Sequence, residues 1–588
     1  MKLVIAEKPS VGAEIAAVLG TNEKKKGYRE GNGYIVSWCV GHLVEPAKPE
    51  SYNEKYKYWD IGDLPILPEK WRFEILKNTS AQYKILKELL NRSDVKEVIC
   101  ATDAGREGET IFRYVYKLSG CKKPVKRLWV SSVEHSEIEK GFANLKADSE
   151  YDNLFNAGYA RAKADWLVGI NFSRLFSCLY NAHLNIGRVQ TPTLNLIVQR
   201  EKEIKNFTPK KYYTIALNFD GMTAESERYD DYYDALKQLA ECNRSTAIIK
   251  SVDIENKEVK PPKLFNLADL QKKANELLGY TAKQTLDIAQ ELYEQKLITY
   301  PRTDSNFITS GMEEKITKLI PLTVEFMNTA IFSENIKVIL NDKKVSDHHA
   351  LIPTVNISDT NAVSALLPSQ KNILQLICLQ LLCAVSAPHV YEQTILKISC
   401  GNVEFTAKGN RLINAGFKSL QNDLLEKITG KPIELKENIL PDILAEGLVL
   451  EKTCEVLEHF TTAPKRFTDS SLISAMERAG NEDYDDDTIE KKGIGTSATR
   501  AGIIEKIIKC GYVERKSKNL VPTEKGITLI KTVPEEIKSP KMTADWESKL
   551  QQIEKGNYTA DEFMRKIEIF VTEIVREYRE KNGKIYKK

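Results

Sequence analysis

Acidic side chains follow two short apolar runs near the amino terminus. Glu7 comes directly after residues 2–6, and Asp103 and Glu107 follow residues 97–101. Such runs are typical of buried strands, with a helix expected from about Glu107, and sites in open α/β sheets lie at the carboxyl ends of the strands. Carboxylates meeting there could share Mg²⁺, which prefers oxygen ligands. The simpler alternative is a helix start, with Asp103 as its cap and Glu107 complementing the helix dipole.

Tyr300 is the second candidate, and it stands directly before Pro301. A proline disfavours helical backbone at the residue before it, so we expect Tyr300 to follow the end of a helix. A tyrosine hydroxyl can attack phosphorus when its proton is removed and a cation steadies the developing charge. Arg302 offers the forked donors that suit phosphate oxygens. The alternative is a turn closed by the polar residues that follow.

Adjacent histidines form the third candidate. His348 and His349 could bind phosphate, transfer protons or ligate a metal, or they could be a structural pair. With Asp347 they are also similar to the Asp-His-His sequence of the DHH phosphoesterases. The further aspartates and histidine that such an enzyme needs are not found in this sequence.

Two glycine-containing segments could contact a phosphate backbone. Residues 187–194 combine a glycine turn with Arg, Gln and hydroxyl side chains, and residues 493–500 lead into an expected helix that begins with exposed amides. Neither segment is a Walker A loop, and no such motif occurs elsewhere in the sequence, so nothing indicates ATP hydrolysis. Arg161 and Asp165 lie four residues apart on an expected helix, where they could also simply pair with each other.

Composition sets the frame for these candidates. A length of 588 residues predicts about four domains, and a net charge of +3 favours no particular partner. We find neither a secretion signal nor an apolar run of about 18 residues, so we expect no membrane span. The ten cysteines are scattered without a CxxC pair, which favours a reduced cytosolic protein without a cysteine-ligated zinc site.

Periodicity divides the rest of the chain into helical and strand-like parts. We expect helices over 151–205 and 264–300 and again from 468 onward, and strands over 210–260 and 392–460.

Six segments, taken in their order along the chain, resemble the type IA DNA topoisomerases and most closely the topoisomerase III branch. They are EKPS at 7–10, DAGREGE at 103–109, GRVQTPTL at 187–194, YPRTDS at 300–305, HHALIPT at 348–354 and GIGTSATR at 493–500. Shorter matches between them extend the resemblance over almost the whole chain.

The resemblance implies a multidomain fold of α/β, helical and β-rich parts. A Toprim α/β domain, helical domains and a β-rich arch would form a toroidal core. The implied bounds are 1–150 for the Toprim domain, 151–210 plus 465–588 for a helical DNA-binding domain, 211–262 plus 390–464 for the β-rich hinge or arch, and 263–389 for the domain with the nucleophilic tyrosine.

It also implies the chemistry and the residues that perform it. Tyr300 would cleave one DNA strand as a 5′-phosphotyrosine, another strand would pass, and the break would be resealed without ATP. Lys8 and Arg302 would steady the phosphate, Glu7 would handle the proton of the leaving oxygen, and His348 would assist. The implied Mg²⁺ ligands are Glu7, Asp103 and Glu107. The implied DNA-binding residues are Arg161, Asp165, Gly187, Arg188, Gln190, Thr191, Thr496 and Arg500.

The expected partner is DNA, bound through single-stranded regions of negatively supercoiled or catenated molecules. We expect a monomer in the cytoplasm, associated with the nucleoid, without a membrane contact and with a helicase or single-strand-binding protein as an expected further partner. Two alternatives remain open. One is a Toprim or DHH-type phosphoesterase that hydrolyses nucleic acid without a protein–DNA adduct, and the other is a single-strand-binding protein on a decayed topoisomerase scaffold.

Three departures from the family pattern are visible. Gly105 replaces the middle aspartate of the usual Asp-x-Asp-x-Glu sequence, so we expect a metal site of lower charge, with Glu109 as an outer helper. Ser497 stands where proline is common, and we expect a small local effect. No cysteine-rich segment precedes Lys588, and we expect the core to suffice for cleavage.

Overall fold

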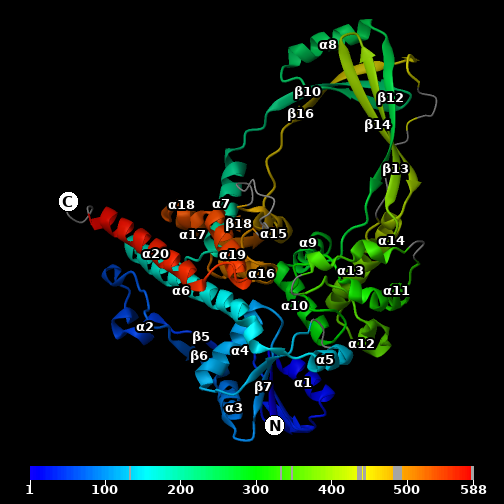
Figure 1. Ribbon diagram of the computed structural model, residues 1–588. Helices are drawn as coiled ribbons and strands as arrows, with labels where there is room; N and C mark the ends of the chain where they lie inside the picture. Colours follow the sequence, from blue (N-terminus) through cyan, green and yellow to red (C-terminus); the bar gives the residue numbers. More distant parts are fainter. Residues whose placement is uncertain are drawn as a thin grey trace.

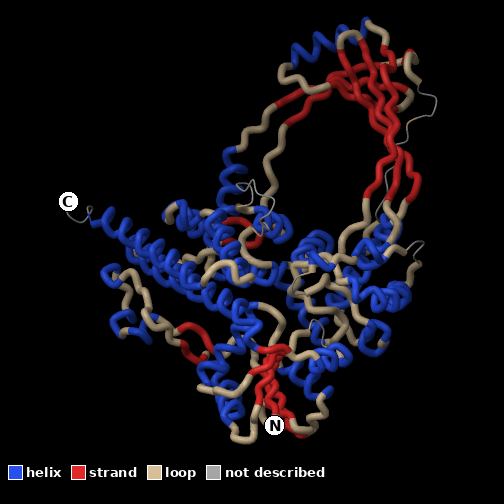
Figure 2. The backbone as a smooth tube through the Cα atoms, viewed as in Figure 1, coloured by secondary structure: helices blue, strands red, loops and turns tan. Residues whose placement is uncertain are grey.

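The chain closes into a ring (Figures 1 and 2). The computed structural model describes residues 1–130, 134–330, 334–345, 348–432, 440, 445–480 and 493–583, so Asp347 of the Asp-His-His sequence lies outside the described residues. An α/β unit and packed helices form the base, and an arch of long strands rises from it on two separate limbs. The toroidal, mixed architecture expected from the sequence is confirmed.

The α/β unit contains a seven-stranded sheet with the order β2-β3-β4-β1-β7-β8-β9, in which β4, β1, β7 and β8 are parallel. Its strands are β1 (Lys2–Ala6), β2 (Glu23–Lys25), β3 (Tyr28–Gly31), β4 (Tyr34–Trp38), β7 (Glu97–Ala101), β8 (Val125–Arg127) and β9 (Lys146–Ala147). Beside it lie the two-stranded β5 (Val44–Pro46) and β6 (Phe73–Ile75) and the short helix α2 (Pro49–Tyr52).

Helices cover both faces of this sheet. The helices α1 (Pro9–Val18) and α5 (His135–Ala143) pack on one face, and α3 (Ser80–Asn91) and α4 (Arg106–Ser119) pack on the other. Alternate residues of β1 therefore point into two different cores, Val4 into the first and Leu3 into the second. Burial on both faces explains why the central strands read as continuous apolar runs, and the strands expected at 2–6 and 97–101 are confirmed.

The other half of the base is helical and joins segments that are far apart in sequence. The long helix α6 (Asp152–Tyr180) lies along α20 (Ala560–Gly583) and α19 (Pro540–Glu554), as Figure 1 shows. The remaining elements here are α7 (Gln190–Asn206), α15 (Asp469–Arg478), α16 (Ser497–Lys509), α17 (Glu524–Thr532), α18 (Glu535–Lys538) and the hairpin β17 (Val513–Lys516) and β18 (Asn519–Pro522). They share one apolar core.

The arch is a second seven-stranded sheet with the order β15-β12-β13-β14-β11-β10-β16. Its strands are β10 (Lys211–Phe219), β11 (Met222–Ser226), β12 (Ala247–Val259), β13 (His389–Cys400), β14 (Val403–Asn414), β15 (Val449–Leu450) and β16 (Thr453–Phe460). The antiparallel pair β10 and β16 continues toward one limb, and β12, β13 and β14 continue toward the other (Figure 1).

A helix interrupts the segment 210–260 that was expected to be strand-like. It is α8 (Tyr232–Arg244), and the side chain of Asp231 caps it by accepting hydrogen bonds from two backbone amides. Ala235 and Cys242 are its buried positions, and they lie seven residues apart on one helical face. The helix covers the apolar side of the arch sheet, which explains why strand alternation stops there.

The segment at the foot of the limb formed by β12, β13 and β14 is helical (Figure 1). It contains α9 (Leu267–Leu278), α10 (Ala282–Glu294), α11 (Glu313–Met327), α12 (Thr360–Ser364), α13 (Pro368–Val385) and, after β14, α14 (Phe417–Thr429). Its core merges with the α1 face of the first sheet. Among the helices of the described ranges, none combines the length and hydropathy that a membrane span needs.

Candidate active site

Glu7 and Asp103 meet at the carboxyl edge of the first sheet. The parallel strands β1 and β7 pair with Ala6 opposite Ala101, so the residues that follow emerge at the same edge. Glu7 is only 4% exposed, and the backbone N–H of Asp103 donates to Glu7 Oε2 at 3.2 Å. Asp103 Oδ2 is buried and has no hydrogen-bond donor among the described residues.

The electrostatics of this pair favour a cation. Burial raises the pKa of Glu7 well above its ordinary value, and the nearby Asp103 raises it further. An acceptor oxygen left without a donor, beside a second buried carboxyl, is the kind of environment that a hard divalent ion satisfies. Glu7 and Asp103 therefore fit a metal such as Mg²⁺, which proteins often hold through one or two carboxylates with waters completing the shell.

Glu107 lines the same cleft, but its carboxylate has other partners. Its carboxylate contacts His42 Nε2 and Arg302 Nη1, each at 3.7 Å. The contact with His42, and then the charge of Arg302, lower the pKa of Glu107 to about 2. Within the described part of the chain, no three His, Cys, Asp or Glu side chains are gathered closely enough to hold a metal ion. Glu107 would have to turn from His42 and Arg302 to join Glu7 and Asp103.

Tyr300 lies in a loop after α10 that is fastened to the histidine segment. The backbone of Thr299 donates to the carbonyl of Ile352 at 3.0 Å, and Ile298 forms a β-bridge with Pro353. This pairing brings the rings of Tyr300 and His348 to 4.5 Å between centroids. His348 Nε2 also contacts the carbonyl of Ala104, which ties the loop to the sheet edge.

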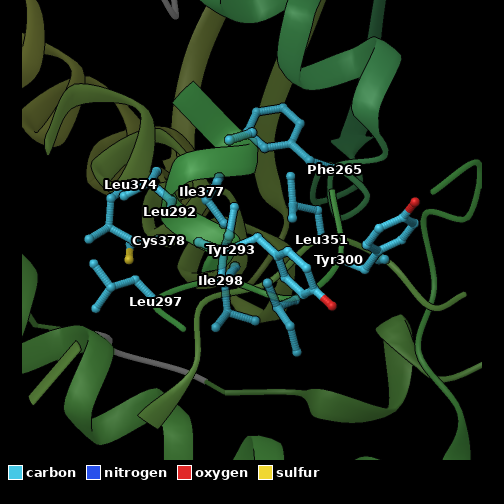
Figure 3. Close-up of a cluster of buried hydrophobic side chains, with 14 of the residues drawn as sticks. Phe265, Leu292, Tyr293, Leu297, Ile298, Tyr300, Leu351, Leu374, Ile377 and Cys378 are labelled. Atoms are coloured by element: carbon cyan, nitrogen blue, oxygen red, sulfur yellow. The ribbon is translucent and has the colours of Figure 1, made fainter. Parts of the chain in front are cut away.

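The Tyr300 side chain stands at the edge of an apolar cluster, with its hydroxyl on the side away from that cluster (Figure 3). It is 7% exposed. Burial raises the pKa of its hydroxyl, the carboxylate of Asp103 raises it further, and the charge of Arg302 acts in the opposite direction. The hydroxyl is therefore protonated at neutral pH, and ionising it as a nucleophile requires additional positive charge or a base.

One cleft of about 160 Å³ joins these groups. Its walls include Glu7, Asp103, Glu107, Tyr300, Arg302, His348, Arg161, Thr496, Arg106, Asp304 and Glu554. Arg302 is the cation beside the tyrosine, and its buried Nε has no acceptor among the described residues. Lys8 does not line the cleft, and its Nζ lies 3.5 Å from Glu294 Oε1.

Two of the expected DNA-binding residues line the cleft, four are buried, and Asp165 and Gly187 belong to neither set. Arg161 and Thr496 line the cleft, and Arg161 Nε lies 3.8 Å from Asp165 Oδ2. Arg188 is buried, with its Nε 2.7 Å from Asp165 Oδ1 and its Nη2 2.9 Å from Glu547 Oε1.

The remaining members of the buried set organise backbone and helices. Gln190 and Thr191 are buried, and the hydroxyl of Thr191 accepts the N–H of Gly187 at 3.2 Å. Arg500 is also buried, and it donates to the carbonyl of Ile494 at 3.2 Å and to Glu477 at 3.3 Å. The contacts of Thr191 and Arg500 fix the loops that lead into α7 and α16.

Glu109 was expected as an outer helper of a metal site, but the structure gives it another partner set. It is fully buried and pairs with Arg113 at 2.8 Å and with Arg127 at 3.1 Å. The pair with Arg113 lies within α4, and the pair with Arg127 attaches α4 to β8. Glu109 therefore supports the sheet edge from inside the core.

Gly105 has a backbone conformation that suits glycine. It precedes α4 with φ of +151° and ψ of 171°, a region that residues with a Cβ rarely adopt. A Cβ at this position would meet no atom within 4 Å. The loop thus leaves an open position where the family pattern has a carboxylate. At the second departure, the Ser497 hydroxyl donates to Asp304, which also lines the cleft.

Sequence reasoning did not assign Arg106, Glu547 and Glu554. Arg106 lies inside the segment 103–109, where its position between the carboxylates was the available signal. The two glutamates come from α19, more than 400 residues later, and no local pattern connects them to the cleft.

The chain resembles known DNA topoisomerases over most of its length. A family model described as DNA topoisomerase matches residues 149–565, and a Toprim domain model matches residues 2–133. The chain is 38% identical to DNA topoisomerase 3 of Bacillus cereus, covering 99% of this chain and 82% of that protein. It is 39% identical to DNA topoisomerase 3 of Shouchella clausii, covering 98% and 80%. The solved structure of full-length topoisomerase I from Thermotoga maritima superposes with a TM-score of 0.74 at 26% identity, covering 97% and 90%.

Proposed function

We propose the residues that carry out the reaction of this chain, which belongs to the type IA DNA topoisomerase family. Tyr300 is the nucleophile of a topoisomerase III reaction performed in the cleft at the sheet edge. The enzyme is an ATP-independent type I DNA topoisomerase. The observation that carries the assignment of residues is the meeting of Tyr300 and His348 with Glu7 and Asp103 in one cleft.

In the cleavage step, Tyr300 Oη attacks a backbone phosphorus. A bond forms between Oη and phosphorus, and the bond to the 3′ oxygen breaks, which leaves a 5′-phosphotyrosine and a free 3′ hydroxyl. The tyrosine loses its proton to water, and the positive charge of Arg302 favours that loss. Resealing reverses the step and conserves the phosphodiester energy, so no nucleotide is consumed.

The leaving 3′ oxygen needs a proton, and Glu7 is placed to supply it. Its raised pKa keeps the carboxyl protonated to a higher pH than an exposed glutamate, which suits a general acid. His348 lies beside the tyrosine ring and is held by the carbonyl of Ala104, so it can contact the phosphate from the other side.

The Toprim domain is a metal-binding fold, and we propose that the ion is Mg²⁺. Glu7 and Asp103 would hold it, with Glu107 joining after it leaves His42 and Arg302. The ion would supply positive charge near the scissile phosphate.

We propose that Arg161 and Thr496 guide a single strand into the cleft, while Arg188 and Arg500 fix the loops that lead into α7 and α16. The substrate would be single-stranded regions of negatively supercoiled or catenated DNA in the nucleoid, approached by a monomer with a helicase or a single-strand-binding protein as a partner. The four-part division at residues 150, 210, 262, 389 and 464 is part of this proposal. The arch, which joins the base through two limbs, would move to admit a strand.

An oligonucleotide assay tests the nucleophile. A single strand labelled at its 3′ end should remain attached to the protein on a denaturing gel, while the same strand labelled at its 5′ end should release a free fragment. Tyr300→Phe should give neither product. Label release from both ends without an adduct would support the phosphoesterase alternative, and binding without any cleavage would support the decayed scaffold.

A further inference from the structure

Arg106 connects the active-site cleft to the carboxyl-terminal helices. It is the first residue of α4 and lines the same cleft as Tyr300 and Arg302. Its guanidinium Nε donates to Glu554, the last residue of α19, and its Nη1 lies 3.5 Å from Glu547, two turns earlier on that helix.

The two glutamates differ in how firmly they are held. The Glu547 side chain is 4% exposed and is shared with Arg188 at 2.9 Å and Arg161 at 3.9 Å. Buried carboxylates with several charged partners do not leave them readily, because the charge would stay uncompensated. The Glu554 side chain is 23% exposed, lines the cleft, and has Arg106 as its cation. Glu547 is therefore a fixed anchor, and Glu554 is an exchangeable partner.

From this difference we propose that Arg106 binds a phosphate of the DNA strand in the cleft, and that Glu554 is an internal carboxylate that occupies Arg106 until the strand arrives. A carboxylate and a phosphodiester each present two oxygens to a guanidinium, so one can replace the other without moving the arginine. Glu547 keeps Arg106 in place during the exchange. The identity of the ligand as DNA rests on the proposed function.

The location of the pair argues against a purely structural role. The ion pairs of Glu109 with Arg113 and Arg127 show how this fold builds a structural cluster, with Glu109 and Arg127 completely buried. The Arg106 and Glu554 side chains instead keep 18% and 23% of their surface exposed, and both face the cleft.

Binding of a fluorescent single strand, followed by anisotropy in EDTA, tests the exchange. Glu554→Gln should bind the strand two- to fivefold more tightly than the wild type. This is roughly the factor by which a part-exposed ion pair between Glu554 and Arg106 would compete with a DNA phosphate. Glu562→Gln is the matched control, since it makes the same charge change on α20, where Glu562 pairs with Lys566 at 3.0 Å. It should bind like the wild type. Equal gains in both variants would overturn the proposal, because net charge alone would then explain them.

A double-mutant cycle identifies the partner of Glu554. In an Arg106→Gln background the gain from Glu554→Gln should disappear, and the slope of log affinity against log salt should be shallower by about 0.7, the contribution of one single-strand phosphate. A gain that persists without Arg106 would overturn the proposal. Thermal unfolding of each variant shows whether the loss of the tighter binding reflects a damaged fold. In that case the cycle is repeated with Arg106→Lys, which retains the positive charge and removes the forked guanidinium.

The binding experiments and the tyrosine-adduct assay test the exchange and the proposed function independently. If the wild type binds single strands but forms no tyrosine adduct, the reaction assigned to Tyr300 fails while the exchange at Arg106 is still measured. If the adduct forms and Glu554→Gln leaves binding unchanged, only the exchange fails.

Discussion

Replacing Gly105 with alanine should lower the free energy of unfolding by about 1–3 kcal/mol, the cost of holding a residue with a Cβ in backbone that is essentially restricted to glycine. The φ of +151° and ψ of 171° place Gly105 in that region. Because a Cβ there would meet no atom within 4 Å, the cost comes from the backbone and not from a clash. Thermal and urea unfolding of the wild type and Gly105→Ala give the difference directly.

Gly105→Asp imposes the same backbone strain and adds a negative charge. Its comparison with Gly105→Ala therefore separates the effect of the charge from the effect of the strain. Without a divalent ion it should be at least as unstable as Gly105→Ala, since the new carboxylate joins Glu7 and Asp103 at the sheet edge. With Mg²⁺ the deficit should shrink, and the Mg²⁺ concentration needed for DNA relaxation should fall, because the site gains a ligand charge. A Gly105→Ala protein as stable as the wild type would refute the backbone argument. Unchanged Mg²⁺ dependence in Gly105→Asp would refute the view that the missing carboxylate weakens the metal site.

Two further predictions concern the buried ion pairs of Glu109 and the second residue of the histidine pair, His349. Glu109→Gln should lower the free energy of unfolding by about 3–5 kcal/mol, since it leaves the fully buried Arg127 without its counter-charge, while Arg113 keeps Asp148 and Asp152; a loss below 1 kcal/mol in urea unfolding would contradict this. For His349, burial lowers the pKa to about 4 from 6.5, so the unfolded chain takes up a proton first as the pH falls. Stability should therefore drop between about pH 6.5 and 4, by at most about 3 kcal/mol and by less for a partly exposed ring. His349→Phe should flatten the pH profile of the unfolding midpoint in this window, and an unchanged profile would assign the loss to other groups.

Local patterns predicted the parts of the site that follow from strand ends and breaks. Glu7 and Asp103 were expected to meet because apolar runs precede both, and the parallel pairing of β1 and β7 brings them together. Tyr300 was expected after a helix because of Pro301, and α10 ends at Glu294. The order of six motifs along the chain predicted the ring itself, which no single motif specifies.

Long-range packing decided what the sequence could not. Glu107 shares a motif with Asp103, yet His42 and Arg302 hold it, and neither partner is near it in sequence. Arg188 and Arg500 were expected to contact phosphate, and the structure shows that both are buried and paired with carboxylates from α6, α19 and α15. Glu554 and Arg106 are separated by more than 400 residues, so only the packing of α19 against the cleft reveals their contact.

The most direct test of the assigned chemistry is the relaxation of negatively supercoiled plasmid in Mg²⁺ without ATP, with wild type beside Tyr300→Phe. We expect the wild type to produce a ladder of topoisomers, which EDTA abolishes and Tyr300→Phe does not produce at any enzyme concentration. Relaxation that survives Tyr300→Phe would contradict the assignment of the nucleophile. A wild type that binds single-stranded DNA but relaxes nothing would contradict the account of an active cleft at Glu7, Asp103 and Tyr300.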